Sequence, residues 1–428
     1  MALICLPCEI YQRGFDAKLL LATRLAAEYG HTVLIGYDKY FTQAIPHLGP
    51  SLLLEKSLSR IMLEGRIAPT RHLGGRVIVS DEEGINNIGI MGEESWLARI
   101  HPRAVQLVDL YACWGHRDAD FFGSVPGLKE KMAILGNCRS DLLNHIGRQF
   151  YKPLIASLKH VFGNFILVSD NFALERLGYH GMARIAEDEA TQHRLQAEYE
   201  QWESEARIRR KHLTVMLRHA VKTFPSQQFI IRPHPRSHPR WWHEHFGAYR
   251  NVQVINRHAV EPWIHACRAV VSMGCTTGLQ ALVAGKPVIE LATPSLESHG
   301  LVSRILPRHC DGPKAFTGEL QRLRDENSPS TYDRAELERS WVNTSRSSTK
   351  FIARACDRLA ASLPGGNPAA LPRVEGLDPE PAKWSENPTI QTVSQKVKRA
   401  CAALDCVPIA IKKVSMGVWL LRSMEAEC

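Results

Sequence analysis

Two apolar runs in the middle of the chain end on residues suited to binding an anion. The first, residues 229–232, passes into Pro-His-Pro, and the second, residues 269–273, passes into GCTTG and a helical pattern. The two prolines fix the direction of the His234 side chain, and a helix N-terminus offers phosphate free N–H groups and a positive dipole end. We expect a phosphate-bearing ligand to be bound at these two strand ends by Arg232, His234, Gly274, Cys275, Thr276, Thr277 and Gly278.

Each half of this pattern has a simpler interpretation. The Thr276/Thr277 pair would serve equally as a plain helix N-cap, and a single histidine is more often structural than ligand-binding. Two such strand ends within one segment favour the phosphate site. Asp170 and Asn171 close another apolar run at 164–172 and are further candidates for contact with the phosphate-bearing ligand or with a hinge.

Three adjacent acids follow an apolar run near residue 80. Asp81, Glu82 and Glu83 repel one another, so at least one is expected to have a raised pKa or a cationic partner. A carboxylate at such a strand end can act as the base that deprotonates a hydroxyl or as the nucleophile of a double displacement. We place Glu83 slightly ahead of Asp81 for this role; the alternative is that two of the three acids are solvated turn or cap residues.

Four charged residues follow the first strand pattern and are candidates for the acceptor side. Loops that follow the strands of a parallel sheet gather at the ligand site, which makes Glu9, Arg13, Asp16 and Lys18 possible contacts. Alternatively, Asp16 caps the following helix and Lys18 is exposed.

These residues require two parallel sheets to position them. In the first half, predicted strands at 2–7, 31–36, 76–84, 107–115 and 131–137 alternate with helical patterns such as 15–30. In the second half, predicted strands at 164–172, 227–235, 251–256, 269–273 and 286–291 alternate with helices near 186–222, 261–268 and 277–284. Strands alternating with helices predict doubly wound α/β domains. No GxGxxG follows the first strand, which argues against a dehydrogenase.

The last quarter of the chain has weaker periodicity. Helical pieces are predicted near 317–325 and 333–362, and residues 363–392 are rich in Pro and Gly, as a linker would be. The tail, 393–428, is basic and apolar by turns and predicts an amphipathic helix. Such a helix either lies on an anionic membrane or packs on the body as part of a terminal helix pair.

The two strand ends together resemble motifs of known enzymes. RPHP followed by SMGCTTGLQALVAGKPVIEL resembles the His-Pro and Ser/Thr motifs of bacterial capsule and lipopolysaccharide glycosyltransferases, including polysialyl- and Kdo-transferases. A similar helix start occurs in UDP-N-acetylglucosamine 2-epimerases. LPCEIYQRG, VSDEEG, DLYACWG and ILGNCRSDLL resemble the surface carbohydrate biosynthesis proteins, so that the likeness covers roughly residues 1–305.

This resemblance implies a GT-B fold, in which two Rossmann-like domains face each other across a cleft, and a nucleotide-sugar donor, CMP-linked ahead of UDP-linked. It adds Asn137 and Arg139 to the acceptor side, in a GNCR segment where the family usually has GNPR. The implied domains are 1–155 for the acceptor, 156–362 for the donor, the linker and a helical C-terminal extension.

The composition of the chain bears on its ligands and on its location in the cell. The 428 residues carry a formal charge of +9, which suits anionic ligands or an acidic membrane surface, although a merely basic surface is an equal alternative. Eleven cysteines, of which only Cys5 and Cys8 have CxxC spacing and lie in or beside an apolar strand pattern, predict reduced thiols and a cytoplasmic location, with contact at the inner face of the membrane left open. The histidines in the RWWHEHF region match no zinc pattern, and no nucleic-acid module is evident; no metal or cofactor is expected.

The sequence thus predicts a glycosyltransferase that moves a sugar, with a Kdo-like acid as first donor, to a surface polysaccharide or glycolipid acceptor. The alternatives are a UDP-sugar 2-epimerase, a CDP-polyol phosphotransferase and a non-catalytic nucleotide-sugar-binding subunit of an assembly complex.

Overall fold

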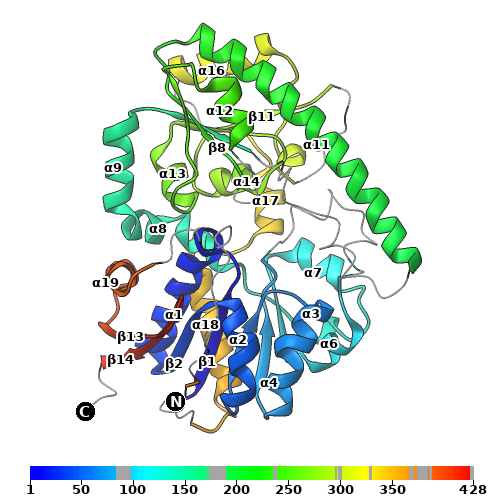
Figure 1. The fold of residues 1–428 in the computed structure, drawn as a ribbon, viewed down its shortest axis with the longest axis vertical. Coiled ribbons are helices and arrows are strands. Elements are labelled where there is room, and N and C mark those ends of the chain that lie inside the picture. Colours follow the sequence, from blue (N-terminus) through cyan, green and yellow to red (C-terminus); the bar gives the residue numbers. More distant parts are fainter. Residues whose placement is uncertain are drawn as a thin grey trace. The chain divides into compact units, whose positions relative to one another are not determined.

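The chain forms two compact units, each built on its own sheet (Figure 1). The computed structural model describes residues 1–82, 97, 99–170, 172, 189–234, 239–294, 296, 301–326, 330–365, 371–372, 374, 384 and 388–424. Unit 1 comprises the described residues within 1–85, 97–151 and 338–428, and unit 2 those within 152–337. Two candidate residues, Glu83 and Asn171, lie outside the described residues.

The sheet of unit 1 is parallel except for a C-terminal hairpin. Its order in the described residues is β13-β14-β2-β1-β3-β4-β5-β6. All six residues of β1 are buried, as expected of a central strand covered on both faces. The strands are β1 (Leu3–Cys8), β2 (Thr32–Tyr37), β3 (Leu52–Glu55), β4 (Arg76–Val79), β5 (Leu110–Cys113), β6 (Met132–Ile134), β13 (Ile409–Ser415) and β14 (Val418–Ser423).

Helices of unit 1 connect these strands and carry residues toward the strand ends. A π-helical turn at Tyr11–Phe15 leads from β1 into α1, which ends at Gly30 in a left-handed cap, as its Gly predicted. The helices are α1 (Asp16–Tyr29), α2 (Asp38–Ala44), α3 (Arg60–Met62), α4 (Ala68–His72), α6 (Pro102–Leu107), α7 (His116–Phe122), α8 (His145–Phe150), α18 (Ser348–Ala360) and α19 (Ile390–Leu404).

The C-terminal segment belongs to unit 1, which corrects the predicted boundary at 362 and the all-helical tail. β14 pairs antiparallel with β2 and covers its edge, and β13 and β14 form a hairpin. The side chain of Asp141 accepts hydrogen bonds from Ser347 Oγ (2.6 Å) and the Ser348 N–H (2.8 Å), which fixes the start of α18 on unit 1. The first predicted boundary, 155, lies four residues beyond Tyr151, the last residue of that part of unit 1.

Unit 2 contains an all-parallel sheet. Its order in the described residues is β12-β11-β10-β7-β8-β9, so that β7 lies between β8 and β10. The strands are β7 (Ile166–Ser169), β8 (Phe229–Arg232), β9 (Val252–Val254), β10 (Ala269–Ser272), β11 (Val288–Leu291) and β12 (His309–Cys310). The helices are α9 (Lys152–Phe162), α11 (Glu189–Thr223), α12 (Arg240–Phe246), α13 (Glu261–Ala266), α14 (Thr276–Val283), α15 (Leu301–Ile305) and α16 (Pro313–Glu326), followed by α17 (Arg334–Ser340), which joins the two units.

The core of unit 2 lies between this sheet and its helices. On α11, Leu213, Met216, Leu217 and Ala220 are fully buried and recur at the spacing of one helix face. No helix in the described part of the chain is long and apolar enough to cross a membrane.

Candidate functional site

Three strand ends of unit 2 meet at one edge of its sheet. Because β7 separates β8 from β10, and neighbouring strands lie about 4.8 Å apart, the ends of β8 and β10 are about 10 Å apart. Cys275 Sγ lies 3.3 Å from Ser169 Oγ, and the Asp170 N–H donates to the Arg232 carbonyl at 3.0 Å. These contacts tie the ends of β10 and β8 to the end of β7, so that His234 and the two threonines share this edge.

The start of α14 packs closely against the end of β10 and needs glycine at two positions. Gly274 has φ +74°, which favours glycine, and a Cβ on Gly278 would lie 2.7 Å from Ser272 Oγ. The N-cap residue is Cys275, which gives the helix no side-chain hydrogen bond, and Thr276 and Thr277 are the first two helical residues. The threonines therefore are not the N-cap, and both are half-buried rather than covered.

Glu290 is the principal residue of this edge that sequence reasoning missed. It lies on β11 beside β10, is 2% exposed, and accepts hydrogen bonds from the Gly274 N–H and from Ser303 Oγ (2.8 Å). Burial raises the pKa of Glu290 to about 7, against the lowering effect of Ser303, Ser272 and the Gly274 N–H. A single acid inside the apolar run VIEL was the signal that could have found it.

Arg232 and Asp170 have internal partners at the same edge. The Arg232 guanidinium donates to the carbonyls of Arg257 (2.6 Å) and His258 (2.9 Å) and lies over the Trp263 ring, 5.3 Å from its centroid. The Asp170 carboxylate accepts from the Phe172 N–H (2.8 Å) and from Trp242 Nε1 (2.7 Å). Arg232 thus holds the loop after β9 in place, and Asp170 holds the segment after β7 and the helix α12.

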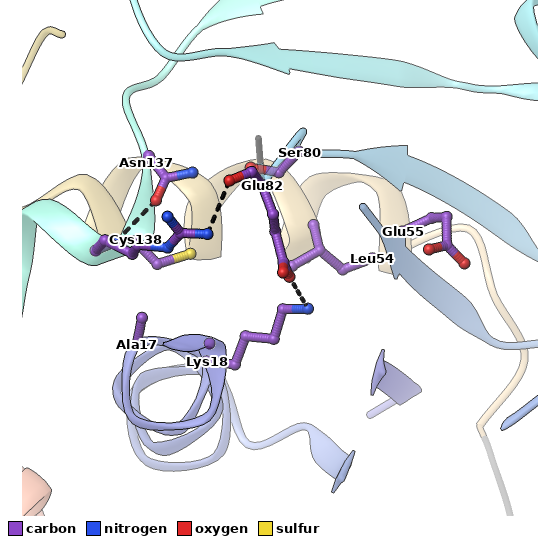
Figure 2. Close-up of a pocket in the computed structure, with 10 residues that line it drawn as sticks. Ala17, Lys18, Leu54, Glu55, Ser80, Glu82, Asn137 and Cys138 are labelled. Carbon is purple, nitrogen blue, oxygen red and sulfur yellow. Dashed lines mark hydrogen bonds and ion pairs between the residues drawn. The ribbon is translucent and has the colours of Figure 1, made fainter. Parts of the chain in front are cut away.

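Unit 1 has a polar cavity at the carboxyl ends of β1, β3 and β4 (Figure 2). Lys18 rises from α1 toward Glu82, with which it forms an ion pair, and it also donates to the Pro7 carbonyl. The cavity is lined by Gly14, Ala17, Lys18, Leu54, Glu55, Ser80, Glu82, Asn137, Cys138 and Arg139. Four residues predicted from the sequence, Lys18, Glu82, Asn137 and Arg139, are therefore brought together.

Glu82 is held as an ionised carboxylate. Burial alone would raise its pKa, but the Lys18 ammonium and then the Arg139 guanidinium lower the pKa of Glu82 below its ordinary value. Arg139 Nη2 also donates to the Glu82 carbonyl at 2.8 Å. A carboxylate stabilised in this way is a weak base, so the structure favours an electrostatic role for Glu82 over proton abstraction.

Asp81 has a buried acid beside it. Trp114 connects the two, because its Nε1 donates to the Asp81 carbonyl (2.6 Å) while its N–H donates to Asp118 Oδ2 (2.9 Å). Burial raises the pKa of Asp118 to about 7; the Trp114 N–H lowers it and Asp81 raises it. Asn137 Nδ2 reaches the same Asp81 carbonyl at 3.5 Å.

The remaining acceptor-side candidates lie around this cavity rather than in its lining. Glu9 forms an ion pair with Lys56, and Arg13 Nη2 donates to the Glu82 carbonyl at 3.4 Å. Asp16 accepts from Tyr151 Oη (2.8 Å) and pairs with Lys396 (2.6 Å). The prediction for Asp16 as a cleft residue is thus not supported, because both of its partners hold α1 to α8 and α19. Lys18 is 6% exposed, which rules out the alternative that it is a surface residue.

The described ranges contain no group of three His, Cys, Asp or Glu side chains arranged to hold a metal ion. The sites therefore consist of hydroxyls, backbone donors, carboxylates and basic side chains.

Comparisons with known proteins identify the fold. No family model and no curated protein matches the sequence. Among solved structures, the UDP-GlcNAc 2-epimerase of Methanocaldococcus jannaschii in complex with UDP-GlcNAc and UDP has a TM-score of 0.51 at 11% identity, covering 82% of this chain and 98% of that one. The S. aureus MnaA–UDP structure has a TM-score of 0.50 at 11% identity, covering 85% and 99%. The chain has the GT-B fold, with two Rossmann-like units, as the sequence predicted.

Proposed function

We propose that this protein is a nucleotide-sugar-dependent glycosyltransferase whose unit 2 binds the donor at the carboxyl ends of β7, β8 and β10. The observation that carries the proposal is the junction of these strand ends, where Cys275 Sγ lies 3.3 Å from Ser169 Oγ and α14 begins with two half-buried threonines. Two neighbours of the same fold were solved with UDP or with UDP-GlcNAc and UDP, which supports a nucleotide-sugar as the ligand class.

In this proposal the donor phosphate is bound by the first turn of α14. The backbone N–H groups and the hydroxyls of Thr276 and Thr277 would hydrogen-bond its oxygens, and His234 would approach from the end of β8. Negative charge grows on the leaving phosphate during transfer, so fixed donors at that position lower the barrier. Arg232 would contribute by holding the 257–258 loop rather than by direct contact.

Unit 1 would bind the acceptor beside the cavity lined by Lys18, Glu82 and Arg139, which itself has room for about one water molecule. These side chains suit a sugar with several hydroxyls, because Lys18 and Arg139 can donate hydrogen bonds to it and the Glu82 carboxylate can accept them. Asp81 and Glu83 remain the proposed bases for the acceptor hydroxyl. Glu82 is assigned the supporting role because its carboxylate is already neutralised by Lys18.

The donor site is tested by isothermal titration with CMP, CDP, UDP, CMP-Kdo and UDP-GlcNAc. Thr276→Val and Thr277→Val each remove one hydroxyl at nearly constant size. A lost hydrogen bond to a charged phosphate weakens binding by roughly 10- to 100-fold. Thr317→Val is the matched control, because its hydroxyl donates within α16 to the Pro313 carbonyl.

The expected pattern is tight binding of one nucleotide family by wild type and by Thr317→Val, and weak binding by at least one α14 variant. Equal affinity in all four proteins would reject the α14 site. No binding of any nucleotide by folded wild type would reject the donor proposal as a whole.

A UDP-sugar 2-epimerase is the second candidate, because one neighbour with a TM-score above 0.50 is such an enzyme. The two are distinguished by incubating the bound sugar nucleotide with the protein alone. An epimerase converts the donor without any acceptor, whereas a transferase leaves it intact apart from slow hydrolysis. A chain that binds the nucleotide, does not convert it alone and transfers no sugar when an acceptor is added would match the non-catalytic subunit.

A further inference from the structure

The long helix α11 changes character halfway along its length. Its first half, residues 189–205, has five glutamates and one arginine, and Arg207 and Arg209 of the second half reach back to Glu203 (2.7 Å) and Glu205 (2.9 Å). These i, i+4 pairs are typical of a solvated helix surface. In its second half, residues 206–223, there are six Lys or Arg residues and no Asp or Glu. Within α11, the ion pairs described for the second half involve only Arg207 and Arg209 at its start, so most of its positive charge is not balanced by acids of the same helix.

The exposed residues of this second half form one stripe. Ile208, Lys211, Val215, Arg218 and Lys222 are all exposed and follow one another at spacings of three and four residues, which places them on one face of the helix. The opposite face, with Leu213, Met216, Leu217 and Ala220, is buried in the core of unit 2. At a rise of 1.5 Å per residue, the stripe is about 21 Å long.

Two apolar side chains lie within this basic stripe. Ile208 is 40% and Val215 is 56% exposed, and both are among the few large apolar residues exposed in the described part of the chain. A soluble polyanion needs cations but gains little from these two residues. An anionic lipid surface meets both, because its headgroups attract Lys and Arg while apolar side chains enter the boundary with the acyl chains.

We propose that this stripe of α11 (Ile208, Lys211, Val215, Arg218 and Lys222) is a peripheral docking surface for an anionic lipid bilayer. The proposal does not depend on the nucleotide site. It also replaces the tail as the membrane-contacting element, since Val393, Val397 and Ala400 of α19 are buried against unit 1. α11 can be followed in Figure 1 as the longest helix, coloured green.

The test is co-sedimentation of the full chain with vesicles of phosphatidylcholine alone or with 30% phosphatidylglycerol, at low and physiological salt. Wild type is expected to bind only the anionic vesicles, and less at higher salt. Each cation near the surface contributes roughly five-fold to partitioning, so the variant Lys211→Glu/Arg218→Glu/Lys222→Glu should lose about 100-fold or more. A second variant, Ile208→Ser/Val215→Ser, should bind more weakly while keeping its charge.

The control variant Lys350→Glu/Lys412→Glu/Lys413→Glu makes the same change in net charge at exposed positions of unit 1 and should bind as wild type does. Circular dichroism and nucleotide titration without vesicles show that each variant is folded. Equal loss in the control variant, or equal binding to neutral vesicles, overturns the proposal. So does binding to heparin without binding to vesicles, or self-association that depends on the stripe.

Discussion

The buried carboxyl of Glu290 makes a sharp prediction, because its protonation is coupled to folding. Its pKa of about 7 in the folded protein compares with an ordinary value of 4.5. Between these values the unfolded chain ionises while the folded one stays protonated, so this group's stabilisation is complete below pH 4.5 and is lost as the pH rises to about 7. At 1.36 kcal/mol per pH unit, the full loss is roughly 3 kcal/mol, most of it between pH 5 and 8.

The perturbation is Glu290→Gln, which removes the ionisation. Its amide oxygen can still accept from the Gly274 N–H and Ser303 Oγ. The free energy of unfolding is measured by urea titration at intervals from pH 5 to pH 8 for wild type, Glu290→Gln and Glu326→Gln, an exposed control in the same unit. Wild type should lose roughly 2–3 kcal/mol relative to Glu290→Gln over this range. A difference between these two proteins that does not vary with pH would refute the reasoning.

The same two proteins, wild type and Glu290→Gln, also test the effect of this ionisation on nucleotide binding over the same pH range. If a phosphate binds at the first turn of α14, ionised Glu290 beside Gly274 opposes it, so nucleotide affinity in wild type should decline above pH 7. Glu290→Gln should show a flatter profile. A decline of equal size in both proteins would assign the pH dependence to another group.

Three further predictions concern the stability of the two units. Gly278→Ala places a Cβ 2.7 Å from Ser272 Oγ and 3.1 Å from Val302 Cγ1, and should destabilise unit 2 by about 1–3 kcal/mol in urea unfolding, whereas Gly312→Ala, with open space around it, should be nearly neutral. Lys18→Met leaves Glu82 buried without its ammonium and should cost about 3–5 kcal/mol, much of it recovered in the double variant with Glu82→Gln; an undiminished loss would show that the pair is not the cause. Trp384→Ala removes a ring that is 2% exposed and should cost about 3–5 kcal/mol in thermal unfolding; little change would mean that the segment around it does not support unit 1.

The sequence predicted the strands that lie inside a repeating pattern and missed those that do not. The runs that became β2, β7, β8 and β10 are rich in β-branched residues and end within two residues of a Gly, Asp or Pro, and the run that became β1 precedes a clear helical pattern. β3 was missed because LLLE, three leucines and one acid, is a short run without a clear partner helix. β13 and β14 were assigned to a helical tail because a basic apolar segment has no local signal for joining an edge strand that lies almost 400 residues away in the sequence.

Residue types at the strand ends predicted which side chains gather at the two sheet edges but not which contacts the individual side chains make. Arg232 was expected to contact a ligand, and instead donates to two backbone carbonyls, because such contacts depend on a loop that the local sequence does not specify. Glu82 was placed among possible bases; its low pKa follows from Lys18 on α1 and from Arg139 after β6. Partners this distant in sequence are brought together only by the tertiary fold.

The acidic side chains of the two sites lose their negative charge in different ways, and this difference affects which ligand each site can bind. In unit 1 the carboxylate of Glu82 is already paired with Lys18, so a ligand entering that cavity meets a nearly balanced set of charges. In unit 2 the first turn of α14 has no side-chain cap from Cys275, and the nearby acid, Glu290, has its pKa raised to about 7 and so is about half protonated at neutral pH. A site at the positive end of a helix dipole, whose neighbouring acid carries only part of its negative charge, favours an anion. The phosphate-bearing substrate therefore belongs to unit 2, and the neutral hydroxylated one to unit 1, in the function proposed above.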